Sequence, residues 1–384
     1  MPSYQVCTRC VMDVTAKDIV FDEEGRCNYC TAFLREMEDF KARTADSQSH
    51  CDELISRIKA AGKGKEYDCI VGVSGGVDSS YALYLAVTHG LHPLAVHLDN
   101  GWNSDEASQN IANMIDKLGV DLHTHVIDWE ENRDLQRSFF KASVVDIELL
   151  MDNAMTALNY QQAAKYGVKY ILLGTNIATE GMSMPPGWNH YKYDAYNIRQ
   201  IHKRFGSVPI KTHPLFSTMD YLRYRLIHKI KAVSFLDYFP YNKSEALELL
   251  RKKFGYKPYP YKHYESVFTR FYQGYILPRK FGYDKRRLHL SNLIVSGQMT
   301  RDEALQLLEG SPYPDPELEE QDRIFVMKKL GFSEDSFNQY MNAPEVPHQA
   351  YGSEEWLWNL LGSVARTVRR SRSSTQNHAV IPIL

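Results

Sequence analysis

The chain has 384 residues, enough for two or three domains, and 43% of them are hydrophobic, which suffices for sizeable cores. Its 45 Lys and Arg residues nearly balance its 47 Asp and Glu residues, so it lacks the overall positive charge of a dedicated nucleic-acid-binding protein. Its first residues do not have the pattern of a signal peptide, and no apolar run is long enough to span a membrane. We therefore expect a cytoplasmic protein that acts on a small molecule and makes no membrane contact.

Four of the six cysteines form two C-x-x-C pairs near the N-terminus. They are Cys7, Cys10, Cys27 and Cys30. In a reducing cytosol, pairs at this spacing are typical of a tetrahedral zinc site, and a redox-active pair is the alternative. We predict a structural zinc ribbon over residues 1–32, with residues 11–26 as a β-hairpin. Cys51 and Cys69 stand alone and are interpreted as core residues.

Residues 33–62 are charged, with Phe33, Met37 and Phe40 at helical spacing and a second amphipathic segment at 54–61. This pattern predicts a helical connector between the ribbon and the main domain.

The most informative stretch is an apolar run at 70–73 that ends in Ser-Gly-Gly-Val-Asp-Ser at 74–79 and continues as an uninterrupted helical pattern. Adjacent glycines permit positive φ and close backbone approach, and the first turn of a helix offers unpaired N–H donors and a partial positive charge. The turn therefore suits a phosphate. It lacks the lysine of the G-x-x-x-x-G-K-[ST] phosphate loop, and the alternative is a glycine-rich corner that binds nothing.

Strands and helices alternate over residues 63–215, with further strands expected at 93–98, 122–127 and 168–173. This alternation predicts an α/β fold with a doubly wound parallel sheet. Ligands of such sheets bind at the carboxyl ends of the strands, so we expect the turn at 74–79 and the loops at 99–102 and 174–180 to share one rim.

A long segment at 177–215, rich in glycine, proline and aromatic residues, is interpreted as a lid or substrate-binding loop. It carries Arg199, Lys203 and Lys211. Arg199 and Lys211 are predicted to stabilise phosphate charge during catalysis, and Lys203 to contact substrate. The alternative is a solvated basic helix face.

Residues 216–345 are predicted to be mainly helical, at 220–232, 244–254, 300–308 and 318–330, around a basic centre rich in tyrosine. Its candidate substrate-binding residues are His263, Glu265, Ser266, Thr269, Lys285 and Arg286. Dense Arg, Lys and Tyr suit a nucleotide-linked sugar, and they equally suit RNA. The tail, residues 346–384, is expected to hold an amphipathic helix with a basic end, and we assign it no chemistry.

The turn at 74–79 is similar to the S-G-G-x-D-S signature of the PP-loop ATP pyrophosphatases, which have an adenine nucleotide alpha hydrolase-like fold and split ATP to AMP and pyrophosphate. The resemblance implies that pyrophosphate and Mg²⁺ are held by Ser74, Gly75, Gly76, Asp78 and Ser79. It places the adenosine beside Leu98, Asp99 and Gly101, and the ribose or α-phosphate beside Gly174 and Thr175. A bare carboxylate at Asp78 would repel phosphate, and a bridging Mg²⁺ removes that conflict. The alternative for Asp99 is an Asx turn that caps its own loop.

Further motifs narrow the family. With the four cysteines, they are Leu-Leu-Gly-Thr-Asn at 172–176, Gly-Tyr-Asp-Lys-Arg-Arg at 282–287, Leu-Ser-Asn-Leu-Ile at 290–294 and Met-Thr-Arg-Asp-Glu-Ala at 299–304. Up to about residue 345 the chain resembles the WbpG-type N-acetyl sugar amidotransferases of bacterial surface polysaccharide (lipopolysaccharide O-antigen) biosynthesis. The resemblance implies a ligase that adenylates the N-acetyl oxygen of a nucleotide-linked sugar and forms an acetamidino group with ammonia. The ammonia would come from a glutaminase subunit working with a cyclase-like barrel subunit.

The sequence is consistent with an external nitrogen source, because Pro rather than Cys follows Met1 and no cysteine lies beyond Cys69. The same count weighs against the alternative of a PP-loop enzyme that thiolates tRNA on its own cysteines. A zinc-ribbon scaffold or nucleotide sensor is the third hypothesis, and it does not explain the second charged cluster, at 284–289.

Overall fold

The computed structural model describes residues 4–44, 47–259, 264–313 and 315–372, and its centre is a five-stranded parallel sheet of order β3-β2-β1-β4-β5. The strands are β1 (Cys69–Gly72), β2 (Pro93–Asp99), β3 (Asp121–Val126), β4 (Tyr170–Leu173) and β5 (Lys231–Ser234). The central strand β1 pairs with β2 through Ile70 and Leu94, and with β4 through Ile70 and Ile171. The predicted doubly wound parallel sheet is confirmed.

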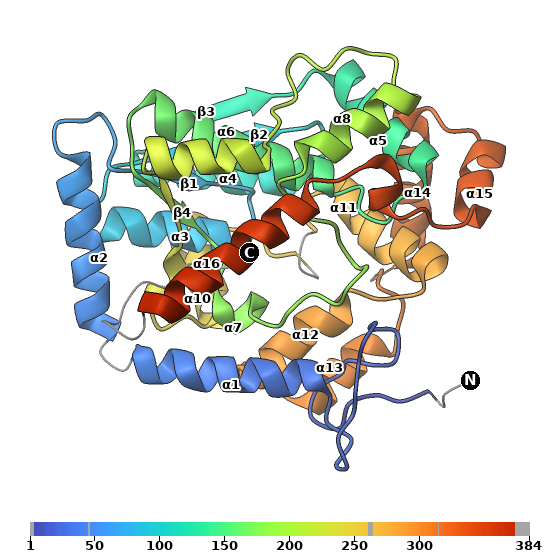
Figure 1. Ribbon diagram of the computed structural model, residues 1–384, viewed down its shortest axis with the longest axis horizontal. Coiled ribbons are helices and arrows are strands. Elements are labelled where there is room, and N and C mark those ends of the chain that lie inside the picture. Colours follow the sequence, from blue (N-terminus) through green and yellow to red (C-terminus); the bar gives the residue numbers. More distant parts are fainter. Residues whose placement is uncertain (1–3, 45–46, 260–263, 314, 373–384) are drawn as a thin grey trace.

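Both faces of the sheet are buried, because successive residues of a strand point to opposite sides. Cys69 and Val71 join a core with helices α2 (Ser47–Gly62), α3 (Val77–Thr88) and α4 (Asp105–Leu118). Ile70 joins a core on the other face with α6 (Leu149–Lys165), α9 (Thr218–Leu222) and the π-helical turn η1 (Arg223–Ile227). Figure 1 shows α3 and α6 on opposite sides of the strands. Cys51 and Cys69 are both buried, as predicted for core residues.

The fifth strand corrects the predicted helix at 220–232. The segment is helical only as far as Ile227, and Lys231–Ser234 then pairs with β4, with Ala232 opposite Ile171. Pairing with a buried neighbouring strand outweighs the helical pattern of the sequence here. The sheet therefore extends past residue 215, where the predicted PP-loop segment ended, and the short helix η2 (Phe235–Tyr238) follows directly.

The remaining elements are helices that pack around the sheet and its first layer of helices (Figure 1). They are α1 (Asn28–Arg43), α5 (Trp129–Ala142), α7 (Ile177–Glu180), α8 (Ala195–Phe205), α10 (Lys243–Phe254), α11 (Val267–Phe271), the π-helical η3 (Tyr272–Phe281), α12 (Arg286–Val295), α13 (Arg301–Leu308), α14 (Pro316–Leu330), α15 (Glu334–Asn342), η4 (His348–Tyr351) and α16 (Glu355–Arg372). The predicted helices at 244–254, 300–308 and 318–330 are confirmed, and α16 is the helix expected in the tail. In the described part of the chain, no helix combines the length and the apolar character that crossing a membrane requires.

The N-terminal segment packs on helices that come late in the chain. Helix α1 contacts α12, and Arg287 of α12 forms an ion pair with Asp13 at 2.9 Å. Arg301 of α13 donates to the carbonyl oxygens of Cys7 and Cys10. The β-hairpin expected at 11–26 is not formed: the structure has two isolated bridges in this region, Val6 with Asp13 and Phe21 with Cys27. The predicted ribbon and the helical region at 216–345 therefore share one interface.

Candidate active site

The turn after β1 is built from its own short side chains. The Ser74 and Ser79 hydroxyls lie 3.2 Å apart, and the Gly76 N–H donates to the Ser74 hydroxyl at 3.3 Å. Gly76 caps α3, so the first N–H groups of that helix face the turn with no side-chain cap. Such a helix start, with its partial positive charge, is a binding site for phosphate.

Two glycines are required by the close packing around this turn. Gly75 has φ +83°, and a Cβ there would lie 2.9 Å from the Ala107 carbonyl oxygen. A Cβ on Gly174, after β4, would lie 2.7 Å from the Ser79 backbone nitrogen. The ends of β1 and β4 and the start of α3 therefore meet without space for larger residues.

Asp78 lies in the first turn of α3, where its carboxylate accepts a hydrogen bond from the Tyr241 hydroxyl. Burial and the neighbouring Asp78 carboxylate raise the pKa of Tyr241, so the phenol keeps its proton and donates it to Asp78. The carboxylate is thus held at the edge of the phosphate turn.

The loop after β2 is paired with a segment more than 160 residues later in the chain. Asn103 and Ser266 form an antiparallel bridge. On one side of it the Ser104 N–H donates to the Glu265 carbonyl oxygen at 2.9 Å, and on the other the Val267 N–H donates to the Trp102 carbonyl oxygen at 2.9 Å. A Cβ on Gly76 would meet the Glu265 carboxylate at 3.1 Å. These contacts fix the start of α11 directly over the phosphate turn.

One cavity of about 650 Å³ lies between these elements. The turn, the ends of β2 and β4, helix α6 and helix α12 all contribute to its wall. Two buried side-chain oxygens in the wall, Asn159 Oδ1 and Thr179 Oγ1, have no hydrogen-bond partner among the described residues. Unpartnered buried polar atoms in a cavity of this size indicate a site for a polar ligand.

Two family models match the two sides of this cavity. Residues 48–184, which include the phosphate turn, match the family described as NAD synthase. Residues 265–365, which include α11 and α12, match the C-terminal domain of the family described as LPS biosynthesis protein WbpG-like. The chain is a PP-loop protein with a WbpG-like C-terminal domain. None of the curated proteins is a match for it.

One solved structure with a similar fold is an NMN synthetase from Francisella tularensis, which is 16% identical in sequence. The match covers 57% of this chain and 99% of that chain, with a TM-score of 0.29. An NH3-dependent NAD synthetase from Campylobacter jejuni subsp. jejuni, in complex with nitrate, has 15% identity, with 56% of this chain and 99% of that chain covered, and a TM-score of 0.29. TM-scores of this size support no conclusion about the site.

Most of the residues predicted for ATP and substrate come together in this cavity. Those that line it are Ser74, Gly76, Asp78, Ser79, Leu98, Gly174, Thr175, Glu265, Ser266, Thr269, Lys285 and Arg286. Gly75 belongs to the same turn but is not part of the lining. Asp99 accepts a hydrogen bond from the Gly101 N–H at 2.8 Å, as the Asx-turn alternative requires, and neither Asp99 nor Gly101 lines the cavity. His263 lies outside the described residues.

Arg199, Lys203 and Lys211 lie elsewhere. They are exposed, on α8 and the loop that follows it, and none of them lines the cavity. The Lys211 N–H instead donates to Glu131 at 2.8 Å. Their catalytic and substrate-binding roles stay predictions.

Several ion pairs that include buried side chains lie at the wall of the cavity. Of these residues, only Lys285 was predicted from the sequence. Lys285 pairs with Glu148 at 2.9 Å, and Gln273 also donates to Glu148. Lys192 pairs with Asp146 at 2.7 Å and Asp152 at 2.8 Å. Glu148, Gln273 and Lys192 belong to no motif, and only the fold brings them to the PP-loop.

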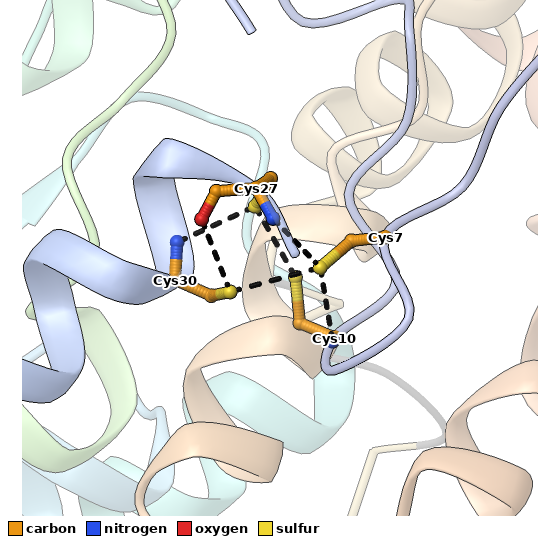
Figure 2. Close-up of side chains that lie close together, drawn as sticks. All are labelled: Cys7, Cys10, Cys27 and Cys30. Carbon is orange, nitrogen blue, oxygen red and sulfur yellow. Dashed lines mark hydrogen bonds between the residues drawn. The ribbon is translucent and has the colours of Figure 1, made fainter. Parts of the chain in front are cut away.

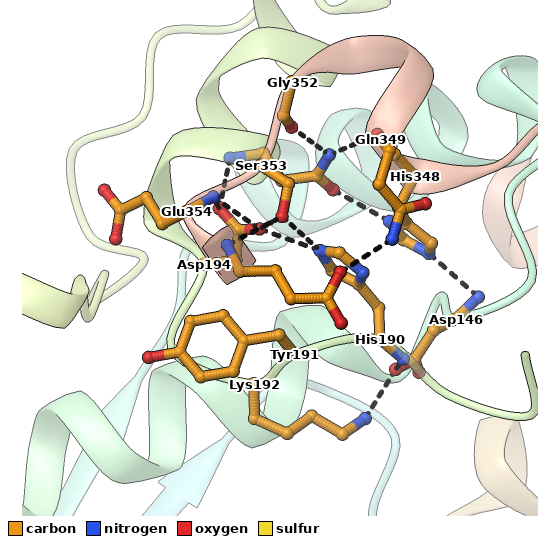
Figure 3. A network of polar contacts seen from close by, with 12 residues as sticks. Asp146, His190, Tyr191, Lys192, Asp194, His348, Gln349, Gly352, Ser353 and Glu354 are labelled. Carbon is orange, nitrogen blue, oxygen red and sulfur yellow. Dashed lines mark hydrogen bonds and ion pairs between the residues drawn. The ribbon is translucent and has the colours of Figure 1, made fainter. Parts of the chain in front are cut away.

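Asp146 also belongs to a second polar network, shown in Figure 3, in which its carboxylate accepts from the His190 N–H at 2.7 Å. His190 and His348 stack with ring centroids 4.3 Å apart, His190 bonds Asp194 at 2.8 Å, and the Asp146 N–H donates to His348 at 3.2 Å. Although burial opposes ionisation, Lys192 and Lys285 lower the pKa of Asp146 to about 2. Although burial alone would lower it, Asp146 and Asp152 raise the pKa of Lys192. The positive charge of Lys192 therefore persists at the cavity wall.

The four N-terminal cysteines converge on one point (Figure 2). All four are buried, and their sulfur atoms lie within 4.8 Å of one another. Backbone N–H groups of Cys10 and Cys27 donate to the Cys7 sulfur at 3.4 and 3.1 Å, an arrangement that favours thiolates. Four convergent thiolates are the donor set of a structural zinc site, so the cluster is compatible with the predicted ribbon metal.

Proposed function

We propose that the protein is an ATP-dependent amidotransferase that converts the N-acetyl group of a nucleotide-linked sugar to an acetamidino group in lipopolysaccharide biosynthesis. The observation that carries the proposal is one cavity of about 650 Å³ that is lined both by the PP-loop and by the WbpG-like domain. Its volume is in the range of cavities that bind a ligand of nucleotide size, and its lining carries the cationic Lys192, Lys243, Lys285 and Arg286, which suit phosphates.

ATP would bind with its β- and γ-phosphates at the turn 74–79, where the first N–H groups of α3 have no side-chain cap. The Ser74 and Ser79 hydroxyls, which bond each other within the turn, line the same part of the cavity. Asp78 is the residue that would hold Mg²⁺, with the Tyr241 hydroxyl orienting its carboxylate. The bound metal would neutralise phosphate charge and orient the leaving pyrophosphate. The α-phosphate would then lie toward Gly174 and the sugar.

In the proposed reaction the acetamido oxygen attacks the α-phosphorus, an O–P bond forms, and the bond to pyrophosphate breaks. Ammonia next attacks the acetamido carbon, a C–N bond forms, and the C–O bond breaks so that AMP leaves with the former amide oxygen. One proton of ammonia is released. No enzyme nucleophile is needed, so the protein contributes mainly positioning and charge stabilisation. Lys192 and Lys285 are the candidates for stabilising charge near the sugar, and a partner glutaminase with a cyclase-like barrel subunit would supply ammonia.

The test is incubation with ATP, Mg²⁺, an ammonium salt and a panel of nucleotide-linked N-acetyl sugars. The proposal predicts that AMP forms only with a matching sugar, and that mass spectrometry finds a product in which one O is replaced by NH. Absence of sugar-dependent AMP across the panel contradicts it.

A further inference from the structure

A second, much smaller cavity lies beside the large one. It measures about 10 Å³, the space that one water-sized molecule requires. Glu148, Met151 and Thr269 line both cavities, so they form the wall between them. His213 also lines the small cavity but not the large one, and the two residues before it, Lys211 and Thr212, are exposed on the surface. The small cavity therefore adjoins the large one, and one of its lining residues follows directly on an exposed segment of the chain.

His213 is the residue that gives the small cavity its chemistry. Its side chain is buried, and within the described residues neither ring nitrogen has a partner at hydrogen-bond geometry, although the Leu150 backbone lies close to the ring. Burial lowers the pKa of His213 to about 4, so the ring is neutral at pH 7, with one nitrogen that donates and one that accepts. Leaving both unpartnered in a buried site is costly unless a small molecule bonds to them.

Other polar groups in the wall are already engaged with each other. The Trp102 indole donates to Gln136 at 2.9 Å, and Asn132 donates to the Asn100 carbonyl oxygen at 2.8 Å. Asn100 itself donates to the Met151 sulfur. These bonds fix the wall, and they leave the His213 ring to bind the occupant. The occupant must be of water size and able both to donate and to accept a hydrogen bond, which describes water and ammonia alike.

We propose that the small cavity binds the ammonia molecule that attacks the activated acetamido carbon, and that ammonia enters the large cavity past Glu148, Met151 and Thr269. The inference rests on the proposed function. A nucleotide and a nucleotide-linked sugar would occupy much of the large cavity, so ammonia needs an entrance that they do not block. The small cavity also has room for ammonia but not for an amine with a methyl group.

The first experiment uses the unmodified protein and compares ammonia with methylamine, at equal concentrations of the unprotonated amine. Sugar-dependent exchange of pyrophosphate into ATP is measured in parallel, because it needs no amine. The inference predicts a kcat/KM for methylamine about 100-fold below that for ammonia, which is the discrimination that one carbon group imposes in a closely fitting site. Equal use of both amines, with exchange intact, overturns the inference and leaves the proposed function standing. If exchange itself is absent, the proposed function fails and the inference fails with it.

Two variants locate the selectivity. Ile147 lines the small cavity and not the large one, so Ile147→Val enlarges the small cavity by one methylene and should raise the use of methylamine relative to ammonia. Ile198→Val, the same change at a buried position of α8 outside both cavities, should leave this ratio unchanged. His213→Phe should raise the KM for ammonia about 10-fold, because the ring nitrogens are lost and the space is filled. Unchanged selectivity in Ile147→Val, or an unchanged KM for ammonia in folded His213→Phe, overturns the assignment of the small cavity as a site for ammonia rather than for water.

Discussion

Lys285 and Glu148 form an ion pair at 2.9 Å in the wall of the large cavity, with both side chains at most 10% exposed. Removing one member leaves a buried charge without its partner, which costs about 3–5 kcal/mol. We therefore expect Lys285→Met to lower the free energy of unfolding in urea by about this amount. The double variant Lys285→Met, Glu148→Gln should recover part of it.

Lys252→Met is the matched control for this pair. Lys252 pairs with Glu248 on the exposed face of α10, and exposed pairs contribute little to stability. An equal loss of stability in both lysine variants would contradict the importance of the buried pair.

Gly75 and Gly64 allow the close packing of the phosphate turn to be tested. Both have positive φ, +83° and +78°, but a Cβ on Gly64 meets nothing within 4 Å whereas one on Gly75 meets Ala107. Gly64→Ala should cost about 1 kcal/mol from backbone strain alone. Gly75→Ala should cost more and should also weaken ATP binding, measured by calorimetry. If the two variants lost equal stability and equal affinity for ATP, the close contact with Ala107 would be unimportant.

The sheet and the phosphate turn could be predicted because their signals are local. The apolar run before Ser74 and the two glycines after it specify strand, turn and helix within a dozen residues. The strand Lys231–Ser234 was missed because its four residues carry no period of their own and become a strand only beside β4.

The wall of the cavity was harder to predict for the same reason. Glu265 and Thr269 were identified from their short spacing, and Lys285 from a cluster of charged residues, and all three line the cavity. The partner of Lys285, Glu148, is 137 residues away in the sequence and carries no motif. Arg199 and Lys211 lie in a basic segment like that of Lys285, yet they are exposed, since charge alone does not show which face of a helix or loop is covered.

Metal removal should affect the large cavity from a distance. Arg301 bonds the Cys7 and Cys10 carbonyls, and Arg287 joins Asp13 to α12, which lines the cavity. If zinc holds the cysteines, chelation should lower the melting temperature and weaken binding of the nucleotide-linked sugar more than that of ATP. Metal analysis before and after chelation checks occupancy. Chelation that removes zinc without either effect would contradict the coupling.

Asp146 predicts a dependence of stability on acid. Its pKa is lowered to about 2 in the folded protein, from about 4 in an unfolded chain, so its ionised form stabilises the fold above pH 4. That contribution, about 2.5 kcal/mol, is lost as the pH falls from about 4 to 2. The free energy of unfolding, measured in urea at several pH values across this window, should depend less steeply on pH in Asp146→Asn than in the unmodified protein. The exposed variant Asp302→Asn should keep the original slope, and so should Asp146→Asn if the assignment is mistaken.

Asp78→Asn tests the proposed metal ligand. Loss of its charge should lower AMP formation by about 100-fold or more while the zinc content and the melting temperature stay unchanged. Asp105→Asn, in the first turn of α4 and outside the cavity lining, is the control. Turnover of Asp78→Asn at the original rate, at saturating Mg²⁺, would remove the carboxylate from the mechanism.

The most direct test of the account follows the acetamido oxygen. A nucleotide-linked sugar that carries ¹⁸O in its N-acetyl carbonyl is turned over with ATP, Mg²⁺ and ammonia, and the AMP is examined by mass spectrometry. Adenylation of the amide oxygen in the shared cavity predicts that each AMP carries one ¹⁸O in its phosphate and that the sugar product carries none. Unlabelled AMP formed together with a sugar that retains its ¹⁸O would contradict the central claim.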